Sequence, residues 1–190
     1  MTGKAALRGR WLFRFPAGRA WSYHSVMPRT GTSRYRVLGI DPGLNITGYG
    51  AVELRGSLLR IIEAGAIRTD PKAGLAERIT QIHADLAALL EELSPDLVAI
   101  ENLYAHYKHP RTSIMMAHAR GIVLLAAQQA HVAIRDLPAT KIKKSLTGNG
   151  HATKRQMQLA VQSQFRLSSP PEPADVADAL AIALCAANRL

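Results

Sequence analysis

Two short apolar segments, each ending on an acidic residue, constrain the fold of this chain more than any other feature. The first, YRVLGID, ends at Asp41 before a Pro-Gly turn, and the second, DLVAIE, ends at Glu101. Their largely apolar composition predicts buried strands. Because α/β sheets bind ligands at the carboxyl ends of their strands, both acids are candidates for a functional site.

The segments around these two strands, 35–41 and 96–101, predict an α/β fold. We expect further strands at 46–53 and 58–68 and a helix at 73–92, which Ser94-Pro95 ends. The later expected elements are a helix at about 112–130, a strand at 131–136, a short basic helix or loop at 138–148, and helices at 152–164 and 174–189. Three antiparallel strands followed by β/α units predict a mixed five-stranded sheet with helices on both faces.

Residues 1–34 differ in composition from the rest of the chain. They contain seven basic residues, no acidic residue and five of the ten aromatic residues, without a helical or strand period. We therefore expect an N-terminal extension at 1–34, outside the fold, and one domain at 35–190. Three interpretations stay open: an upstream start codon, with the functional chain beginning near Met27; a basic arm that contacts nucleic acid; or an organellar transit peptide.

The overall composition narrows the class of protein. The chain has 190 residues and one cysteine, which excludes a disulfide framework, and no apolar run reaches the ~18 residues of a membrane span. The formal charge of +10 indicates an anionic partner, nucleic acid before a membrane surface. Residues 104–155 hold nine basic residues and one acid, so a basic surface is expected beside the acidic strand ends.

Four carboxylates, those of Asp41, Glu101, Asp175 and Asp178, form the candidate site. Asp175 and Asp178 share one helix face because they are three residues apart. Each acid also has an ordinary structural explanation: an Asp-Pro-Gly turn for Asp41, and a favourable helix dipole for the helical pair. Carboxylates brought to ~4 Å repel by about 1–4 kcal/mol per pair, so a converging cluster needs a cation. A ligand set made only of acids selects Mg²⁺ or Mn²⁺, and two such ions are usual at a phosphodiester.

At these residues the chain resembles the RuvC family of Holliday-junction resolvases, whose fold is ribonuclease H-like. The resemblance covers residues 36–190. It rests on these motifs: RVLGIDPGLNITGYG (36–50), IENLYAH (100–106), ARG (119–121), KIKKSLTGNGHATK (141–154) and ADVADALAIAL (174–184). It implies that Asp41, Glu101, Asp175 and Asp178 bind two Mg²⁺ ions, for which Mn²⁺ can substitute, and are catalytic.

The resemblance also implies DNA-contacting residues. Tyr104 matches an aromatic residue that the family uses against a base at the junction, and Lys143 and Lys154 match phosphate-contacting lysines. The basic loop after Glu101 and the basic cluster at 141–155 extend this surface, although a run of lysines can also simply be a solvated helix face. The predicted DNA-binding residues are Tyr104, Lys108, Arg111, Lys141, Lys143, Lys144, Lys154 and Arg155.

The expected partners follow from the resemblance and from one helix. The helix at 112–130 is apolar nearly all round, which calls for cover on two sides, either by a second subunit or by the chain's own helices. We expect a homodimer acting on four-way junction DNA in the bacterial cytoplasm, in recombination and DNA repair. By resemblance, a RuvA-RuvB branch-migration complex is a further partner; no membrane association and no organellar import are expected.

Other functions stay open at this level. A ribonuclease H-like nuclease acting on RNA or flapped DNA would have the same acids, and a non-catalytic DNA-binding module would share the basic surface. An actin-like or sugar-kinase ATPase also opens with a strand and an Asp-x-Gly turn, but it needs a second, duplicated domain that 190 residues do not hold.

Overall fold

The computed structural model describes residues 4–7, 10–13, 21–22, 34–102 and 110–188, with side chains from 34 to 102 and from 112 to 188. A five-stranded mixed sheet, in the order β6-β5-β4-β7-β8, forms its centre. The strands are β4 (Arg34–Asp41), β5 (Ile46–Arg55), β6 (Leu58–Arg68), β7 (Leu97–Glu101) and β8 (Ala133–Leu137). β4, β5 and β6 are antiparallel, whereas β7 and β8 run parallel to β4, as the sequence predicts.

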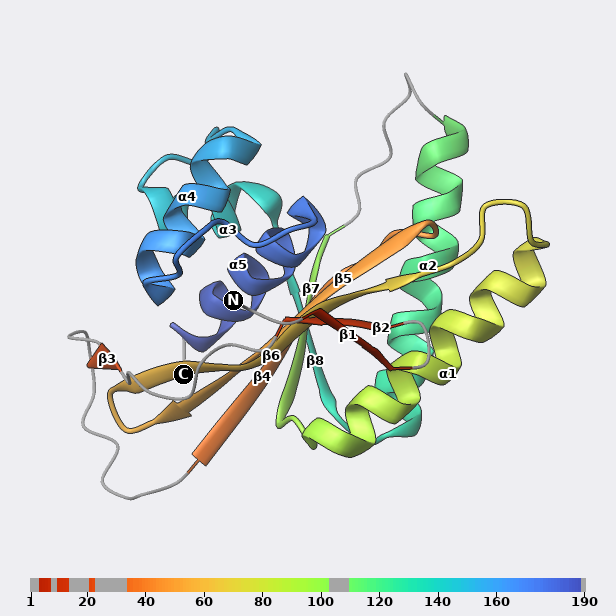
Figure 1. Cartoon of the computed structure of the whole chain (residues 1–190), viewed down its shortest axis with the longest axis horizontal. Coiled ribbons are helices and arrows are strands. Elements are labelled where there is room, and N and C mark those ends of the chain that lie inside the picture. The colour runs from red at the N-terminus through yellow and green to blue at the C-terminus, as the bar shows by residue number, and fades with distance from the viewer. Residues whose placement is uncertain (1–3, 8–9, 14–20, 23–33, 103–109, 189–190) are drawn as a thin grey trace.

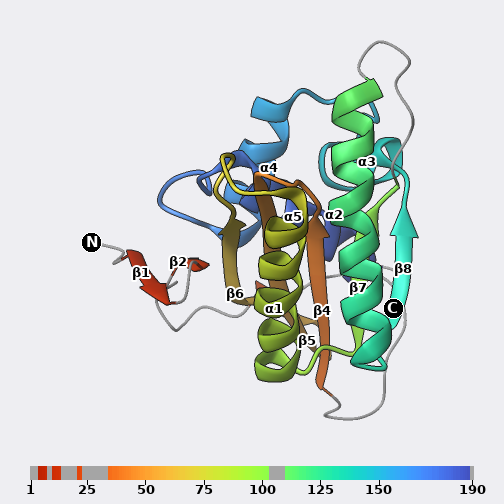
Figure 2. The same ribbon diagram turned by 90° about the vertical axis from the view of Figure 1, so that its right-hand side faces the viewer.

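Helices cover both faces of this sheet (Figures 1 and 2). α1 (Leu75–Leu93) and α2 (Pro110–Gln129) lie on one face, and α5 (Ala174–Ala187) lies on the other with α3 (Ala139–Thr147) and α4 (Lys154–Phe165). Alternating strand residues divide the core accordingly: Leu38 and Ile40 pack with α1 and α2, and Val37 packs with α5. The bounds of these elements lie within two residues of the predicted ones, and the segment at 138–148 is a helix rather than a loop.

The structure differs from the prediction at the N-terminus. We expected residues 1–34 outside the fold, but three short strands precede β4: β1 (Lys4–Leu7), β2 (Arg10–Phe13) and β3 (Trp21–Ser22). β2 and β3 both pair antiparallel with β6, whose other edge is occupied by β5. An open strand edge offers backbone donors and acceptors to any extended segment, and segments of two to four residues are too short to show a period. The role of this stretch stays a prediction.

One polar cluster lies at the end of the sheet where β4 begins. Glu53 has no exposed surface, and its carboxylate accepts hydrogen bonds from the guanidinium groups of Arg36, Arg55 and Arg60. The pairing register places Arg36 and Arg60 on either side of Glu53 in neighbouring strands. Burial alone would raise the pKa of Glu53, but the hydrogen bonds of Arg60 and Arg36 and the charges of Arg60 and Arg55 outweigh it and hold the pKa below its ordinary value.

Candidate active site at the strand ends

Asp41 and Glu101 lie side by side where two parallel strands end. β4 pairs with β7 in a register that sets Ile40 beside Ile100, so the next residue of each strand is the acid. Neighbouring strands are about 4.8 Å apart, which fixes the two backbones at that spacing. The acidic strand ends predicted from the sequence therefore meet at one edge of the sheet.

α5 brings the other two acids to the same place because glycines let it approach the sheet. A Cβ atom on Gly48 would lie 2.1 Å from the carbonyl oxygen of Asp175, and one on Gly39 would lie 2.2 Å from that of Ala179. Gly48 is the residue paired with Asp41. The first turn of α5 therefore rests on the strand beside Asp41, and Asp178 follows on the next turn. The four predicted acids therefore lie near one another, and their roles in catalysis and metal binding stay predictions.

The electrostatics of the cluster reflect this crowding. Burial, followed by the charges of Asp178, Asp175 and Glu101, raises the pKa of Asp41 to about 7, against the lowering effect of Lys154. Burial and the charge of Asp178 also raise the pKa of Glu101. Burial raises the pKa of Asp178 as well, with Asp175 adding to the effect and Lys154 opposing it. Three carboxyl groups are thus harder to ionise than usual, chiefly because they are buried and also because they face other acids.

Two lysines flank the acids. Nζ of Lys154 lies 3.8 Å from Oδ2 of Asp178, and this lysine side chain is 81% exposed. Lys143 is half-buried on α3, and its charge lowers the pKa of both Glu101 and Asp178. Lys154 occupies the first position of α4, where Thr153 and Gln156 form a capping box that fixes the start of the helix. Both lysines can therefore reach the acids and an anion bound beside them.

The remaining predicted basic residues lie farther from the acids or outside the described parts. Lys141 on α3 is half-buried, and Lys144 on α3 and Arg155 on α4 are exposed; within the described residues none of the three forms an ion pair with the acids. Tyr104 and Lys108 lie outside the described residues, and Arg111 lies in α2 without a described side chain. The predicted roles of these six residues in binding DNA stay predictions.

The acids fit divalent metal ions by their chemistry more than by their present geometry. Within the side chains described here, no group of three or more His, Cys, Asp or Glu residues already stands in an arrangement that could hold a metal ion. Burial, more than the neighbouring acids, raises the pKa values of Asp41, Glu101 and Asp178, and a bound cation would favour their ionised forms. All-oxygen ligands suit Mg²⁺ or Mn²⁺.

The sequence analysis missed the glycines that assemble this site. Gly39, Gly48 and Gly50 stand at alternate or neighbouring positions of two buried strands, and a Cβ atom on any of them would clash with α5. Glycine inside a strand is a known sign of another backbone passing close by, so the pattern GIDPG…TGYG carried the signal.

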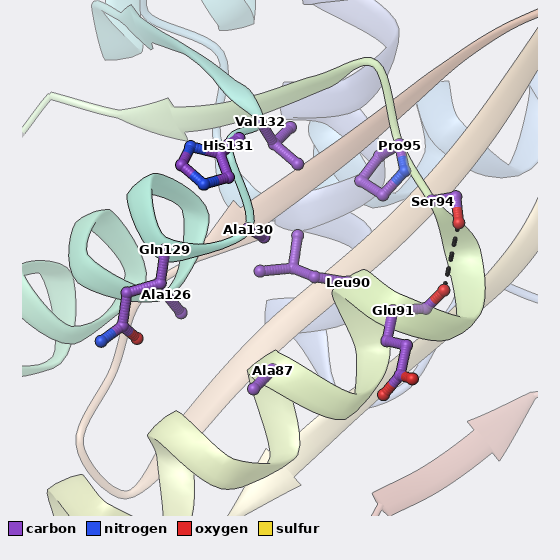
Figure 3. Close-up of a pocket in the computed structure, with 10 residues that line it drawn as sticks. All are labelled: Ala87, Leu90, Glu91, Ser94, Pro95, Ala126, Gln129, Ala130, His131 and Val132. Atoms are coloured by element: carbon purple, nitrogen blue, oxygen red, sulfur yellow. Dashed lines mark hydrogen bonds between the residues drawn. The ribbon is translucent and has the colours of Figure 1, made fainter.

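A separate pocket of about 600 Å³ lies at the opposite end of the molecule (Figure 3). It lies between the C-terminal ends of α1 and α2, near the start of β8, with Leu90, Ala126 and Val132 among its lining residues. Glu91 is the one acid in that lining. The pocket therefore has no part in the acidic cluster at the strand ends.

Comparison with known proteins identifies one family. The family model of the crossover junction endodeoxyribonuclease RuvC matches residues 37–186. A crossover junction endodeoxyribonuclease RuvC of Rhodopirellula baltica is 50% identical over 149 residues, covering 78% of this chain and 84% of that protein. The solved structure of Thermus thermophilus RuvC superposes with a TM-score of 0.72 at 35% identity, covering 80% and 93% of the two chains.

A second structure, of Thermus thermophilus RuvC in complex with a Holliday junction substrate, gives a TM-score of 0.75 at 34% identity and the same coverage. The mixed sheet flanked by helices, with acids at its strand ends, defines the ribonuclease H-like class. Within that class, the chain belongs to the RuvC family of crossover junction endodeoxyribonucleases.

Proposed function

We propose that this protein resolves Holliday junctions by cutting two strands of a four-way DNA junction, in recombination and DNA repair. The observation that carries the proposal is the meeting of Asp41, Glu101, Asp175 and Asp178 beside two lysines in a chain of the RuvC family. A relative of 34% identity, aligned over 80% of this chain, has been solved with such a junction as its substrate. A non-catalytic DNA-binding module would have no use for four acids that repel one another.

The four acids would hold two Mg²⁺ ions, with Mn²⁺ as a substitute. Bound there, the ions supply Lewis-acid activation of a water molecule and neutralisation of the leaving oxygen at a phosphodiester. The chain's own contribution is to fix the acids on rigid elements: two strand ends and the first turns of one helix. Lys143 and Lys154 oppose the raised pKa values, because their charges favour the ionised carboxylates that a metal ion needs.

DNA would approach over α3 and α4. Lys143 and Lys154 stand beside the acids, so they would contact the phosphates next to the cut bond. Lys141, Lys144 and Arg155 lie on the same two helices and would extend the phosphate contacts along one duplex arm of the junction. We assign Lys108 and Arg111, in and after the loop that follows β7, to the same surface. Tyr104 would stack on a base unpaired at the crossover.

A second copy of the chain would complete the enzyme by packing on α2. α1 and β8 of the same chain contact α2 and cover part of its apolar surface. On the other side Ile114 is 58% and Leu125 47% exposed, and Gly121 between them has open space around it. These three residues share one helix face because they are spaced seven and four apart. A two-fold dimer through this apolar face would offer two sites to the two equivalent strands of a junction.

Sedimentation velocity tests the dimer. Leu125→Glu should give monomers that bind a junction weakly, because it places a charge in the centre of the apolar face. Leu159→Glu, on α4 and 43% exposed, is the matched control and should stay dimeric. A Leu125→Glu variant that sediments as a dimer would place the interface elsewhere.

Two wider expectations rest on the family alone. We propose that a RuvA-RuvB branch-migration complex presents the junction, and that the enzyme works in the bacterial cytoplasm. In the described residues no helix is long and apolar enough to cross a membrane.

The deciding experiment is incubation of the protein with an end-labelled synthetic four-way junction, with and without Mg²⁺. Paired nicks near the crossover, absent with chelator or with Ca²⁺, are expected. Duplex, flapped DNA and RNA of matched length separate this function from that of another ribonuclease H-like nuclease. Preferred cutting of RNA or flaps, or full activity in excess chelator, would contradict the proposal.

A further inference from the structure

Arg78 is a buried cation in α1 that the proposed chemistry does not use. Its side chain is 6% exposed, and no carboxylate in the described part of the chain forms an ion pair with it. Burying a guanidinium group away from water is costly unless it is well hydrogen-bonded. Its partners therefore indicate what the side chain is for.

Those partners are Asn45, in the loop that follows Asp41, and Thr69, directly after β6. Nε of Arg78 donates to Oγ1 of Thr69 over 2.9 Å, and Nη2 donates to Oδ1 of Asn45. Thr69 links Arg78 to a second loop residue, since its hydroxyl donates to the carbonyl oxygen of Leu44 over 2.6 Å. The backbone N–H of Thr69 also donates to the carbonyl oxygen of Asn45. One guanidinium group thus fixes the second half of the 42–45 loop against the end of β6.

The first half of this loop is held from the other side. Oγ1 of Thr47 donates to the carbonyl oxygen of Gly43 over 2.7 Å. The described part of the chain contains four buried polar or charged side chains, and three of them, Thr47, Thr69 and Arg78, belong to this network. Such a concentration of buried polar groups on three loop residues indicates that the shape of the loop matters.

The loop follows Asp41 directly and connects it to β5, where Gly48 pairs with Asp41. The charges that chiefly shift the pKa of Asp41 are those of three acids and Lys154, and Arg78 is not among them. An effect of Arg78 on Asp41 would therefore pass through the loop backbone, which its hydrogen-bond partners hold. We propose that Arg78 is a positioning residue: it clamps the 42–45 loop and thereby fixes the end of β4 that carries Asp41, one of the acids that would bind metal. This inference rests on the proposed function.

The test uses Arg78→Met and Asn45→Ala, which break the clamp from its two ends. Gln81→Ala is the matched control, because Gln81 lies one turn further along α1 and bonds the backbone of Arg68 over 2.9 Å without touching the loop. Amide hydrogen exchange in chelator measures the loop without metal or DNA. Titration with Mn²⁺, followed by electron paramagnetic resonance, measures metal binding without DNA.

In both clamp variants the amides of residues 43–46 should exchange at least tenfold faster than in the wild type. The Mn²⁺ concentration at half-saturation should rise at least tenfold. Arg78→Lys, which keeps the charge and one donor direction, should recover part of both effects, and Gln81→Ala should match the wild type. Junction cleavage at saturating substrate should fall with the loss of metal binding, with little change in KM.

Unchanged loop exchange or unchanged Mn²⁺ binding in Asn45→Ala would overturn the proposal, even if Arg78→Met unfolds. Faster loop exchange with wild-type metal binding would make Arg78 a purely structural residue and would equally overturn it. If the wild type cuts no junction while the clamp variants still loosen the loop and lose Mn²⁺, the proposed function fails and the positioning role stands.

Discussion

Replacing Asp41 with asparagine should stabilise the metal-free protein although it abolishes cleavage. The carboxyl group of Asp41 is largely buried and faces three other acids, and its pKa is raised to about 7. Keeping this group ionised at pH 8 without a cation therefore costs folding free energy. Asparagine has almost the same shape and no charge, so the variant is free of that cost.

The size of the effect follows from the pKa. A rise from 3.8 to about 7 spans about three pKa units, each worth about 1.4 kcal/mol. The folded state binds this proton more tightly than the unfolded state. The stabilisation by the protonated group is complete below pH ~4 and is lost as the pH rises through about 7. At pH 8 in chelator the variant should exceed the wild type by about 2–4 kcal/mol, roughly 5–15 °C in Tm, and at pH 4 the two should be nearly equal.

Thermal and urea unfolding at pH 4, 6 and 8 in chelator measure this difference. Glu77→Gln, an exposed acid in the first turn of α1, is the control and should show no such pH dependence. Added Mn²⁺ should reverse the order, because it stabilises the wild type by binding only the folded site. The electrostatic reasoning would be refuted if Asp41→Asn were less stable than the wild type at pH 8 in chelator. It would also be refuted if the difference in stability between the two proteins were the same at all three pH values.

Three further changes test other parts of the structure. Gly48→Ala should reduce cleavage about 100-fold, since the added Cβ displaces the first turn of α5 by about 1 Å. Gly74 has open space around it, so Gly74→Ala is the control and should cut normally. Equal activity of the two variants would contradict the close approach of α5. Lys143→Ala and Lys154→Ala should each reduce the slope of log K against log salt for junction binding by ~0.9, and an unchanged slope would place that lysine off the DNA. Glu53→Gln should lower the free energy of unfolding by about 1–3 kcal/mol, less than for a fully buried ion pair because the surrounding arginines are half-exposed. Because the pKa of Glu53 is lowered, this difference in urea unfolding should persist above pH ~4.5 and shrink as the pH falls through the folded pKa; a constant difference would argue against the charge.

The central fold was predictable because its strands and helices differ plainly in period. The apolar run before Asp41 and the one before Glu101 have the length of buried strands, and α1 repeats its leucines and isoleucines at helical spacing. The ends of the elements shift by one or two residues, since caps and not periods decide where a helix stops. The short strands β1, β2 and β3 could not be predicted, because their pairing depends on the open edge of β6 and not on a pattern of their own.

The candidate site was predictable only in part. The four acids could be chosen from their places at strand ends and in the first turns of a helix. The sequence does not show how close α5 comes to the sheet, because that depends on which strand face the three glycines occupy. The contacts of Arg78 could not be predicted either, since Asn45, Thr69 and Arg78 lie in three separate segments of the sequence and meet only in the fold.

The burial of α5 stabilises the same arrangement that the repulsion between the acids destabilises. Bringing Asp175 and Asp178 toward Asp41 costs a few kcal/mol while no cation is bound. Residues 176–187 of the same helix are buried almost throughout, and Val176, Leu180, Ile182 and Leu184 are at most 2% exposed. Each of these four side chains contributes roughly 1.5–3 kcal/mol on burial, so together they exceed the cost of the repulsion. The burial of α5 is therefore sufficient to hold Asp175 and Asp178 beside the sheet against this repulsion.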